Sequence, residues 1–378
     1  MTDFDTTLLQ WATPLEAEAL RAGSAEALGI SEDSYRQRLL RVKLKAARSG
    51  YSPRHDQTHV VPPGQHIRGV STLYKGDGTV AMQWVKSAKD VEDKLTAIRE
   101  AMADMVAEYT GVAAPVAPPE GAVDEDYLAV YPLGDPHVGM VSWAPETGTS
   151  YDLKIAEQDI CGVVDRLVSI APPTSRALVI DMGDFFHTDD SSNRTFASKH
   201  VLDVDSRYAK MCSVGLRIKR RVVDRVLQRH QHVTLWNRQG NHDQHTSLML
   251  GAAMAAIYER EPRLTVSQEP SQFDVMRFGQ CLIAATHGHT VRAGARLPQL
   301  LAARYPQLWG ATQWRVWYTG HVHHESVKEF PGCLVETVRA LAPKDGWAHA
   351  AGFESERDLR CDLWHREKGR TTRLSERV

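Results

Sequence analysis

The sequence has few features that would place the protein outside a cell or in a membrane. Its 378 residues include only five cysteines, scattered without a Cys-x-x-Cys pair, which is typical of reduced thiols rather than of a disulfide framework. No stretch approaches the roughly 20 apolar residues that span a bilayer. The first residues lack the basic start and apolar run of a signal peptide. We therefore expect a cytoplasmic protein that does not contact a membrane.

A net charge is also nearly absent. The formal charge is -2, so the overall balance says little about partners, and local patterns carry the information. Apolar residues make up 42% and charged residues 24% of the chain, which is the mix of a globular protein. We find no internal repeat at a solenoid period. The length suggests two or three domains.

The composition changes abruptly over residues 112–126, which are rich in proline, alanine and acidic residues and have no amphipathic period. Such a segment is typical of a semi-extended linker. We therefore expect a small domain over residues 1–111, this linker, and a larger domain over residues 127–378.

Within the first domain, residues 24–42 predict a helix-turn-helix, with Ser31 as the N-cap of the second helix. An Asp77-Gly78 turn between two β-rich runs predicts a hairpin, and residues 90–109 predict an amphipathic helix. The pattern is winged-helix-like. Basic residues on the second helix are Arg36, Arg38, Arg41 and Lys43. They suit a helix that contacts DNA phosphates, and a solvated packing or partner-binding module is the alternative.

In the second domain, five apolar strand candidates each end in carboxylate, amide or imidazole side chains. In chain order these are Asp135 and His137, Asp184, Asn241 with His242 and Asp243, His287, and His321 with His323. Ligands gather at the carboxyl ends of strands in open α/β sheets, so we expect one site. The donor types suit divalent ions such as Mn, Fe or Zn. Gly183 leaves room for Asp184 to bridge two ions.

The ordered motifs DPH, GD, GNHD, HG and GHVH resemble those of the calcineurin-like metallophosphoesterase superfamily, over roughly residues 127–325. The resemblance implies an α/β fold, a four-layer α/β/β/α sandwich, with two divalent metal ions. Manganese is the first choice, and iron, zinc or magnesium are alternatives. The implied reaction is phosphodiester hydrolysis by a metal-bridging hydroxide in an in-line attack.

The resemblance also implies roles for the matching residues. One ion would be held by Asp135, His137, Asp184 and His323. The other would be held by Asp184, Asn241, His287 and His321. His242 would protonate the leaving oxygen or steady the phosphoryl group, and Asp243 would orient its ring. His289, two residues after His287, is an alternative ligand at that position.

Two further patterns bear on the substrate. The GDFFH segment resembles a motif of SbcD-type DNA nucleases, and by that likeness His187 positions a DNA strand or the leaving group; a supporting hydrogen bond is the alternative. Residues 214–229 form a basic helix that either attracts a polyanion or is a solvated face. The whole layout is similar to uncharacterised phage-encoded phosphoesterases, which implies a host cytoplasm.

We therefore expect a metal-dependent DNA nuclease whose partner is a nucleic acid. A homodimer would be compatible with the SbcD-type likeness, although no interface is visible in the sequence. The first alternative is a phosphoesterase for nucleotides or other small molecules. The second is a DNA-binding regulator that uses the phosphoesterase fold as a scaffold.

Overall fold

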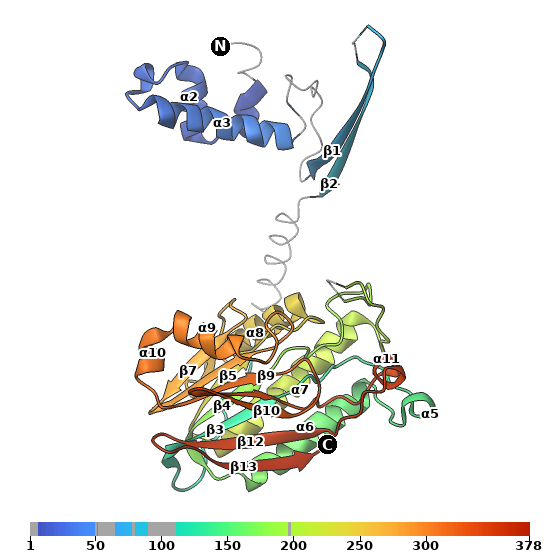
Figure 1. The fold of residues 1–378 in the computed structure, drawn as a ribbon, viewed down its shortest axis with the longest axis vertical. Helices are drawn as coiled ribbons and strands as arrows, with labels where there is room; N and C mark the ends of the chain where they lie inside the picture. Colours follow the sequence, from blue (N-terminus) through green and yellow to red (C-terminus); the bar gives the residue numbers. More distant parts are fainter. Residues whose placement is uncertain (1–6, 50, 52–64, 78–79, 90–110, 196–197) are drawn as a thin grey trace. The chain divides into compact units, whose positions relative to one another are not determined.

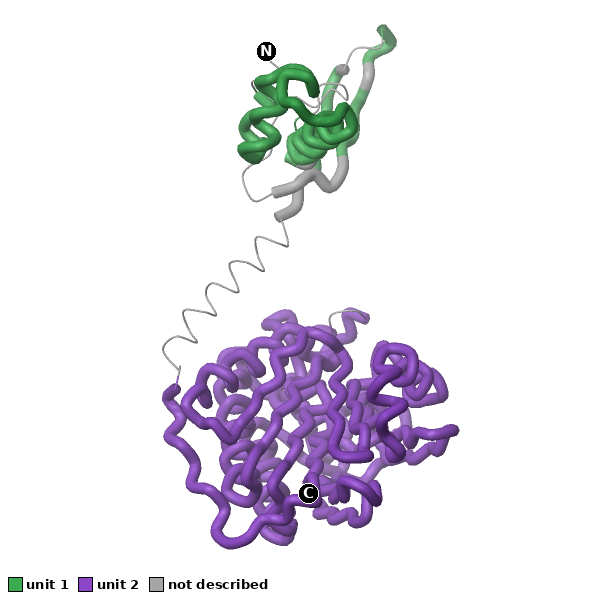
Figure 2. The backbone as a smooth tube through the Cα atoms, turned by 90° about the vertical axis from the view of Figure 1, so that its left-hand side faces the viewer, with its two compact units in different colours: residues 1–104 green, residues 105–378 purple. Residues whose placement is uncertain are grey.

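The computed structural model describes residues 7–49, 51, 65–77, 80–89, 111–195 and 198–378 (Figure 1). The chain forms two compact units, Met1–Asp104 and Met105–Val378, and each is described by itself (Figure 2). Among the helices of the described residues, none is long and apolar enough to cross a membrane. The helix expected over residues 90–109 lies outside the described residues.

The N-terminal part of the first unit is helical. Its helices are η1 (Leu9–Trp11), α2 (Pro14–Ala22), η2 (Glu26–Leu28) and α3 (Glu32–Arg48). The Ser31 hydroxyl accepts a hydrogen bond from the Ser34 amide at 3.2 Å, so the predicted N-cap of α3 is confirmed. The preceding helix of the predicted pair is a single turn, because Gly29 adopts a left-handed conformation directly after η2. A small core joins α2 to α3 through Leu8, Leu20, Val42 and Ala46.

The basic residues of α3 have different surroundings. Arg36 is exposed and pairs with Glu32 one turn earlier at 3.2 Å, whereas Arg38 is half-buried. Arg41 and Lys43 are exposed. After the helices, β1 (Gln65–Tyr74) and β2 (Val80–Lys89) pair antiparallel, as a turn at Asp77 predicts.

The second unit contains two sheets (Figure 1), and the α/β class expected from the sequence is confirmed. The six-stranded sheet has the order β13-β12-β3-β4-β5-β6, in which β3 to β6 are parallel. Its strands are β3 (Asp124–Leu133), β4 (Thr174–Asp181), β5 (His232–Asn237), β6 (Leu264–Val266), β12 (Asp358–His365) and β13 (Gly369–Arg377).

The five-stranded sheet has the order β10-β11-β9-β8-β7, with β11, β9 and β8 parallel and both edge strands antiparallel. Its strands are β7 (Asp274–Phe278), β8 (Cys281–Thr286), β9 (Trp314–Thr319), β10 (Ser326–Phe330) and β11 (Cys333–Thr337). The helices of the unit are α5 (Ala144–Thr147), α6 (Leu153–Ile170), α7 (Tyr208–Arg229), α8 (Gln244–Ile257), α9 (Arg296–Arg304), α10 (Pro306–Gly310) and α11 (Gly346–Ala350).

Alternation along the strands explains how the layers pack. Leu128 and Val130 of β3 enter a core with residues of β8, β9 and β12, so this core lies between the two sheets. Ala129 and Tyr131, which point the other way, join the core that includes α6, α7 and α8. On the far face of the five-stranded sheet, β8 and β9 pack against α9. One core therefore lies between the two sheets, and two further cores join the sheets to helices.

Part of the segment predicted as a linker packs on the second unit. The amides of Gly111 and Ala113 donate to carbonyls at the end of α8, at 2.8 and 3.2 Å. The amide of Val116 donates to Glu261 at 2.8 Å, and β3 already begins at Asp124. The composition alone gives no signal for these contacts, because they are made by the backbone.

The basic helix expected over residues 214–229 is the C-terminal part of α7. The helix also has a buried apolar stripe, which consists of Val214, Ile218, Val222 and Val226. Arg217 pairs with Glu157 at 2.9 Å and Arg221 pairs with Asp165 at 2.8 Å, and both acids belong to α6. These pairs favour the structural interpretation of the helix over a surface that binds a polyanion.

Candidate metal centre

The ends of five strands bring the expected ligands together. Asp135 and His137 follow β3, Asp184 follows β4, Asn241 follows β5, His287 follows β8, and His321 and His323 follow β9. The strand-end pattern predicts a single sheet edge. In the structure, β3, β4 and β5 belong to the six-stranded sheet, whereas β8 and β9 belong to the other. The centre therefore lies where the carboxyl edges of two packed sheets meet.

Two groups of side chains could each hold a metal ion, because their ligand atoms lie within 4.8 Å of one another. The first group is Asp135, His137 and His323, and the second is Asp184, His287 and His321. The Oδ1 atom of Asn241 lies 3.2 Å from Nε2 of His287, so the amide adjoins the second group. The structure thus brings all seven expected ligands into one region.

The hydrogen bond of His287 fixes which ring nitrogen faces Asp184. Nδ1 donates to the carbonyl of Met182 at 2.9 Å, because a carbonyl can only accept. Nε2 consequently faces Oδ2 of Asp184 at 3.2 Å. Burial lowers the pKa of His287, but the carboxylates of Asp184 and Asp135 outweigh it and raise the pKa to about 10. A divalent cation would compete with that proton for Nε2.

The remaining imidazoles are suited to bind a cation as neutral ligands. Burial lowers the pKa of His137 well below its ordinary value, and lowers those of His321 and His323 to about 4. Nε2 of His137 lies 3.2 Å from Nε2 of His323, so two ring nitrogens converge. Burial raises the pKa of Asp135 to about 7, because a protein interior stabilises the charged carboxylate less than bulk water does. Buried carboxylates beside neutral imidazoles fit divalent cations.

Backbone strain concentrates at the same residues. Among the described non-glycine residues, positive φ occurs at Asp135 (37°), His137 (44°), Asp184 (50°), His321 (71°) and His323 (59°), and also at Asn193 and Lys199. Such conformations cost about 1–3 kcal/mol each and persist where the surroundings enforce them. Their coincidence with the expected ligands indicates that the fold holds these side chains in place at a cost in stability.

Two glycines make this close approach of chains possible. A Cβ atom on Gly240 would lie 1.9 Å from Oδ1 of Asp184, so a side chain is excluded there. Gly183 has φ of 95°, and a Cβ atom there would lie 2.8 Å from the amide nitrogen of Gly240. The amide of His242 then donates to Oδ1 of Asp184 at 2.8 Å, which fixes the carboxylate.

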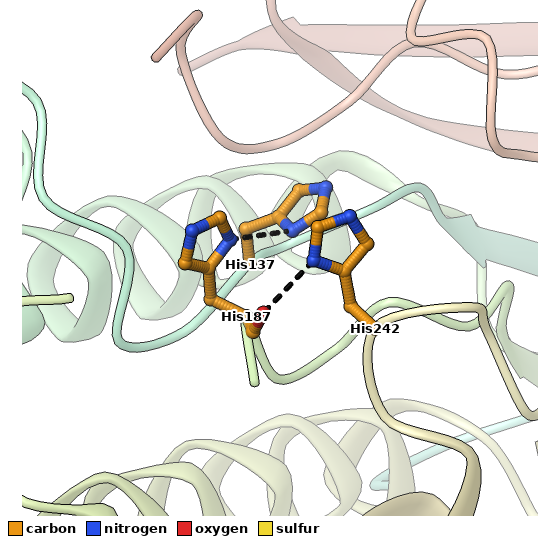
Figure 3. A group of neighbouring side chains, drawn as sticks. All are labelled: His137, His187 and His242. Carbon is orange, nitrogen blue, oxygen red and sulfur yellow. Dashed lines mark hydrogen bonds between the residues drawn. The ribbon is translucent and has the colours of Figure 1, made fainter. Parts of the chain in front are cut away.

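Three histidines form a further cluster beside the first group (Figure 3). Nδ1 of His187 lies 3.2 Å from Nδ1 of His137, and the rings of His187 and His242 stack with centroids 5.2 Å apart. Nδ1 of His242 donates to the carbonyl of His187 at 2.9 Å. The structure therefore places His187 and His242 together next to a candidate ligand.

Asp243 has a different role from the one that the family resemblance implies. Its carboxylate accepts hydrogen bonds from the amides of Asp184, Phe186 and Gly240 and from the hydroxyl of Ser247. The ring of His242 is oriented by a carbonyl instead. Asp243 thus acts on the centre through the backbone that carries Asp184. Its fully buried carboxyl group has a pKa raised to about 8 by burial and by the charge of Asp184.

Lys219 and His289, both near the centre, differ from what the sequence predicts. The buried ammonium of Lys219 pairs with buried Asp181, whose other oxygen accepts the amide of Gly183 at 3.0 Å. The helical period of α7 places Lys219 beside the apolar stripe, which is the signal for its burial. His289, the alternative ligand, lies outside the groups of the described residues that could hold an ion, and neither ring nitrogen has a hydrogen-bond partner.

No protein-family model matches the chain, and no curated protein matches it. Among solved structures, it is similar to a zinc complex of Vps29 from Entamoeba histolytica, with 14% identity, a TM-score of 0.30, and coverage of 66% of this chain and 98% of the other. It is also similar to an archaeal phosphodiesterase, with 11% identity, a TM-score of 0.34, and coverage of 67% and 99%. A third similar structure is an uncharacterised protein from Streptococcus pneumoniae that is described as a predicted phosphoesterase. Its identity is 14% and the TM-score is 0.27, with coverage of 66% of this chain and 98% of the other. All three TM-scores are below 0.5.

Proposed function

We propose that the protein is a metal-dependent phosphoesterase that cleaves phosphodiester bonds. The observation that supports this most strongly is the convergence of the two ligand groups with His242 beside them. In the proposal, Asp135, His137 and His323 would hold one divalent cation, and Asn241, His287 and His321 would hold the other. Asp184 would be a ligand that both ions share. When bound, such a pair supplies Lewis acidity and lowers the pKa of water. Manganese is the proposed metal, with iron, zinc or magnesium as alternatives.

His242 is the proposed general acid. The bond from its Nδ1–H to the carbonyl of His187 fixes the ring, and leaves Nε2 without a hydrogen-bond partner in the described chain. The side chain is partly exposed and its ring lies 4.8 Å from that of His137. As an imidazolium, His242 would place a proton from Nε2 on the leaving oxygen of the substrate. A placed acid of this kind contributes about 10²–10⁴-fold to the rate.

The substrate that we propose is DNA, cleaved by a nuclease of the SbcD-like, phage type in a host cytoplasm. Support comes from the GDFFH segment, which supplies His187 next to His242, and from exposed Arg41 and Lys43 on α3. Arg41 and Lys43 would contact the phosphate chain as basic residues of a helix, whereas His187, which is buried, would act on the centre through His242. The winged-helix-like character of the first unit, and a homodimer, belong to this proposal as well.

Cleavage of labelled linear and circular DNA in the presence of Mn²⁺ tests the proposal, with bis(p-nitrophenyl) phosphate as a small diester. We expect His242→Ala to bind the metals and to lose about 10²–10⁴-fold in kcat. Asp184→Asn should lose both ions, as measured by calorimetry. His232→Ala, which removes an exposed imidazole on β5, is the matched control.

The outcomes separate the alternatives. Hydrolysis of the small diester without cleavage of DNA would move the substrate to nucleotides or other small molecules. A chain that binds DNA but takes up no metal would instead be a regulator built on this fold. If His242→Ala abolished metal binding, the role of His242 as a proton donor would be wrong.

A further inference from the structure

A side pocket of about 290 Å³ adjoins the candidate metal centre. It lies on the side of the five-stranded sheet, and its lining includes His321, which is also a member of the second ligand group. The pocket and the centre therefore share a wall. The polar and charged lining residues are Arg292, Thr319, His321, His324, Ser326, Lys328 and Thr337. No acidic side chain of the described residues is among those that line it.

Two glycines are among the residues that line the side pocket. Gly288 follows β8 and Gly320 follows β9, so this part of the lining lies at the edge of the sheet that also delivers ligands. Gly288 has φ of 107°, and its ideal Cβ position lies 3.5 Å from the carbonyl oxygen of Gly320. A residue with a Cβ atom at Gly288 would therefore be strained by its backbone conformation.

Two cations face the side pocket from different elements. Arg292 precedes α9, and Lys328 lies on β10. Both are exposed, and neither has an ion pair or hydrogen bond in the part of the chain that the structure describes. The nearby acid Glu325 is already engaged by arginines, including Arg339 at 3.0 Å. The positive charge of Arg292 and Lys328 is therefore not neutralised by neighbouring carboxylates.

We propose that the side pocket binds a second phosphate group of the substrate, next to the phosphodiester that is cleaved. The inference rests on the proposed function and deepens it by naming the substrate class, which is a nucleotide chain carrying at least two phosphates. A guanidinium presents paired donors to phosphate oxygens, and an ammonium adds a point charge. A pocket of about 290 Å³ is roughly ten times the volume share of one water, about 30 Å³, so a phosphate with part of its sugar fits.

The phosphate that the side pocket binds could be a monoester or a diester, and each would come from a different part of a substrate. It is either a terminal phosphate of a short nucleotide or the next phosphate along an oligonucleotide. Thymidine dinucleotides with a 5′- or a 3′-phosphate provide the first source, and the unmodified thymidine trinucleotide provides the second. Bis(p-nitrophenyl) phosphate and the unmodified dinucleotide carry a single phosphate and serve as references.

The test variant is Arg292→Gln combined with Lys328→Gln. Its matched control is Arg296→Gln combined with Lys154→Gln, which removes the same charge at exposed positions that do not line the side pocket. We expect the test variant to lower the preference in kcat/KM for two-phosphate over one-phosphate substrates by about tenfold or more, through KM, as the loss of a charged hydrogen bond predicts. The control variant should keep the wild-type preference.

A preference that is equal in the wild type and the test variant would overturn the proposal. An effect with phosphorylated dinucleotides alone identifies a terminal phosphate, whereas an effect that includes the trinucleotide identifies the chain phosphate. If the wild type hydrolysed none of these substrates, the proposed function would fail, and binding of pyrophosphate to the metal-free protein would still test the pocket. Weaker pyrophosphate binding in the test variant than in the control supports the pocket, and equal binding in both refutes it.

Discussion

The imidazole of His230 gives a contribution to stability whose pH dependence can be worked out from its surroundings. The side chain is fully buried at the end of α7. Nε2 lies 2.8 Å from the hydroxyl of Tyr131, and Nδ1 accepts the amide hydrogen of Thr174 at 3.2 Å. Burial disfavours the charged ring, and the nearby charge of Arg229 adds to this, so the pKa of His230 falls from 6.5 to about 3.

The sign follows from comparing the two states. The unfolded chain binds this proton near pH 6.5, whereas the folded chain does not bind it until about pH 3. The contribution of His230 to stability is therefore constant above pH 6.5 and is lost as the pH falls from 6.5 toward 3. At about pH 5 the difference is roughly 1.5 pH units, which at about 1.36 kcal/mol per unit gives about 2 kcal/mol.

The perturbation is His230→Asn, which keeps an acceptor for the amide of Thr174 and cannot take up the proton. Urea unfolding of the full chain in EDTA, followed by tryptophan fluorescence, gives the free energy of unfolding at about pH 7.5 and pH 5. We expect the wild type to lose about 2 kcal/mol more than the variant over this interval. His232→Asn on neighbouring β5 is the matched control for removal of a histidine. Equal losses in wild type and His230→Asn would refute the reasoning, because the folded protein would then take up the proton.

Two further predictions concern the centre and the basic helix. Gly240→Ala should weaken Mn²⁺ binding about 10–100-fold in calorimetry, because its Cβ would lie 1.9 Å from Oδ1 of Asp184 and displace the carboxylate. Gly251→Ala, whose Cβ would meet nothing closer than 3.8 Å, is the control, and equal affinities for both variants would contradict the prediction. Arg41→Gln combined with Lys43→Gln should weaken the salt dependence of DNA binding. The slope of log K against log salt concentration should fall in magnitude by about one for each phosphate that α3 no longer neutralises. An unchanged slope, as expected for Lys154→Gln in the second unit, would show that α3 does not contact DNA.

The expected ligands could be located from the sequence because each follows an apolar strand. These strands are continuous apolar runs that are buried over most of their length, and such runs can be recognised without tertiary information. The carboxyl end of each strand then fixes where the next side chains lie. The spacing of His321 and His323 adds to this. In the structure their backbone is left-handed at both positions, and the alternation of an extended strand does not describe them. The motif therefore locates the two histidines correctly at the end of β9, although the backbone that carries them is not an extended strand.

The function of Asp243 could not be derived in the same way. Adjacency in sequence to His242 suggests contact between their side chains, but the chain turns there, and the carboxylate points into the backbone around Asp184 and Gly240. The direction of the Asp243 side chain depends on which buried backbone amides need a hydrogen-bond acceptor. That need arises only in the folded core. The sequence also does not show that the expected ligands come from two different sheets, because that depends on the order in which the strands pair.

The meeting of two sheets has a consequence for the centre. The side chains between the sheets, including Ile180 of β4 and Val316 of β9, set the separation of the two sheets and so of the ligands that follow β4 and β9. Met182 belongs to the same core, and its carbonyl accepts the hydrogen bond that orients His287. Protein cores are close-packed, so a change of side-chain volume here shifts one edge against the other. If the ligand groups bind metal ions as proposed, a change of packing between the sheets would change the metal affinity, and we expect the positive-φ backbone at the ligand positions to depend on that packing.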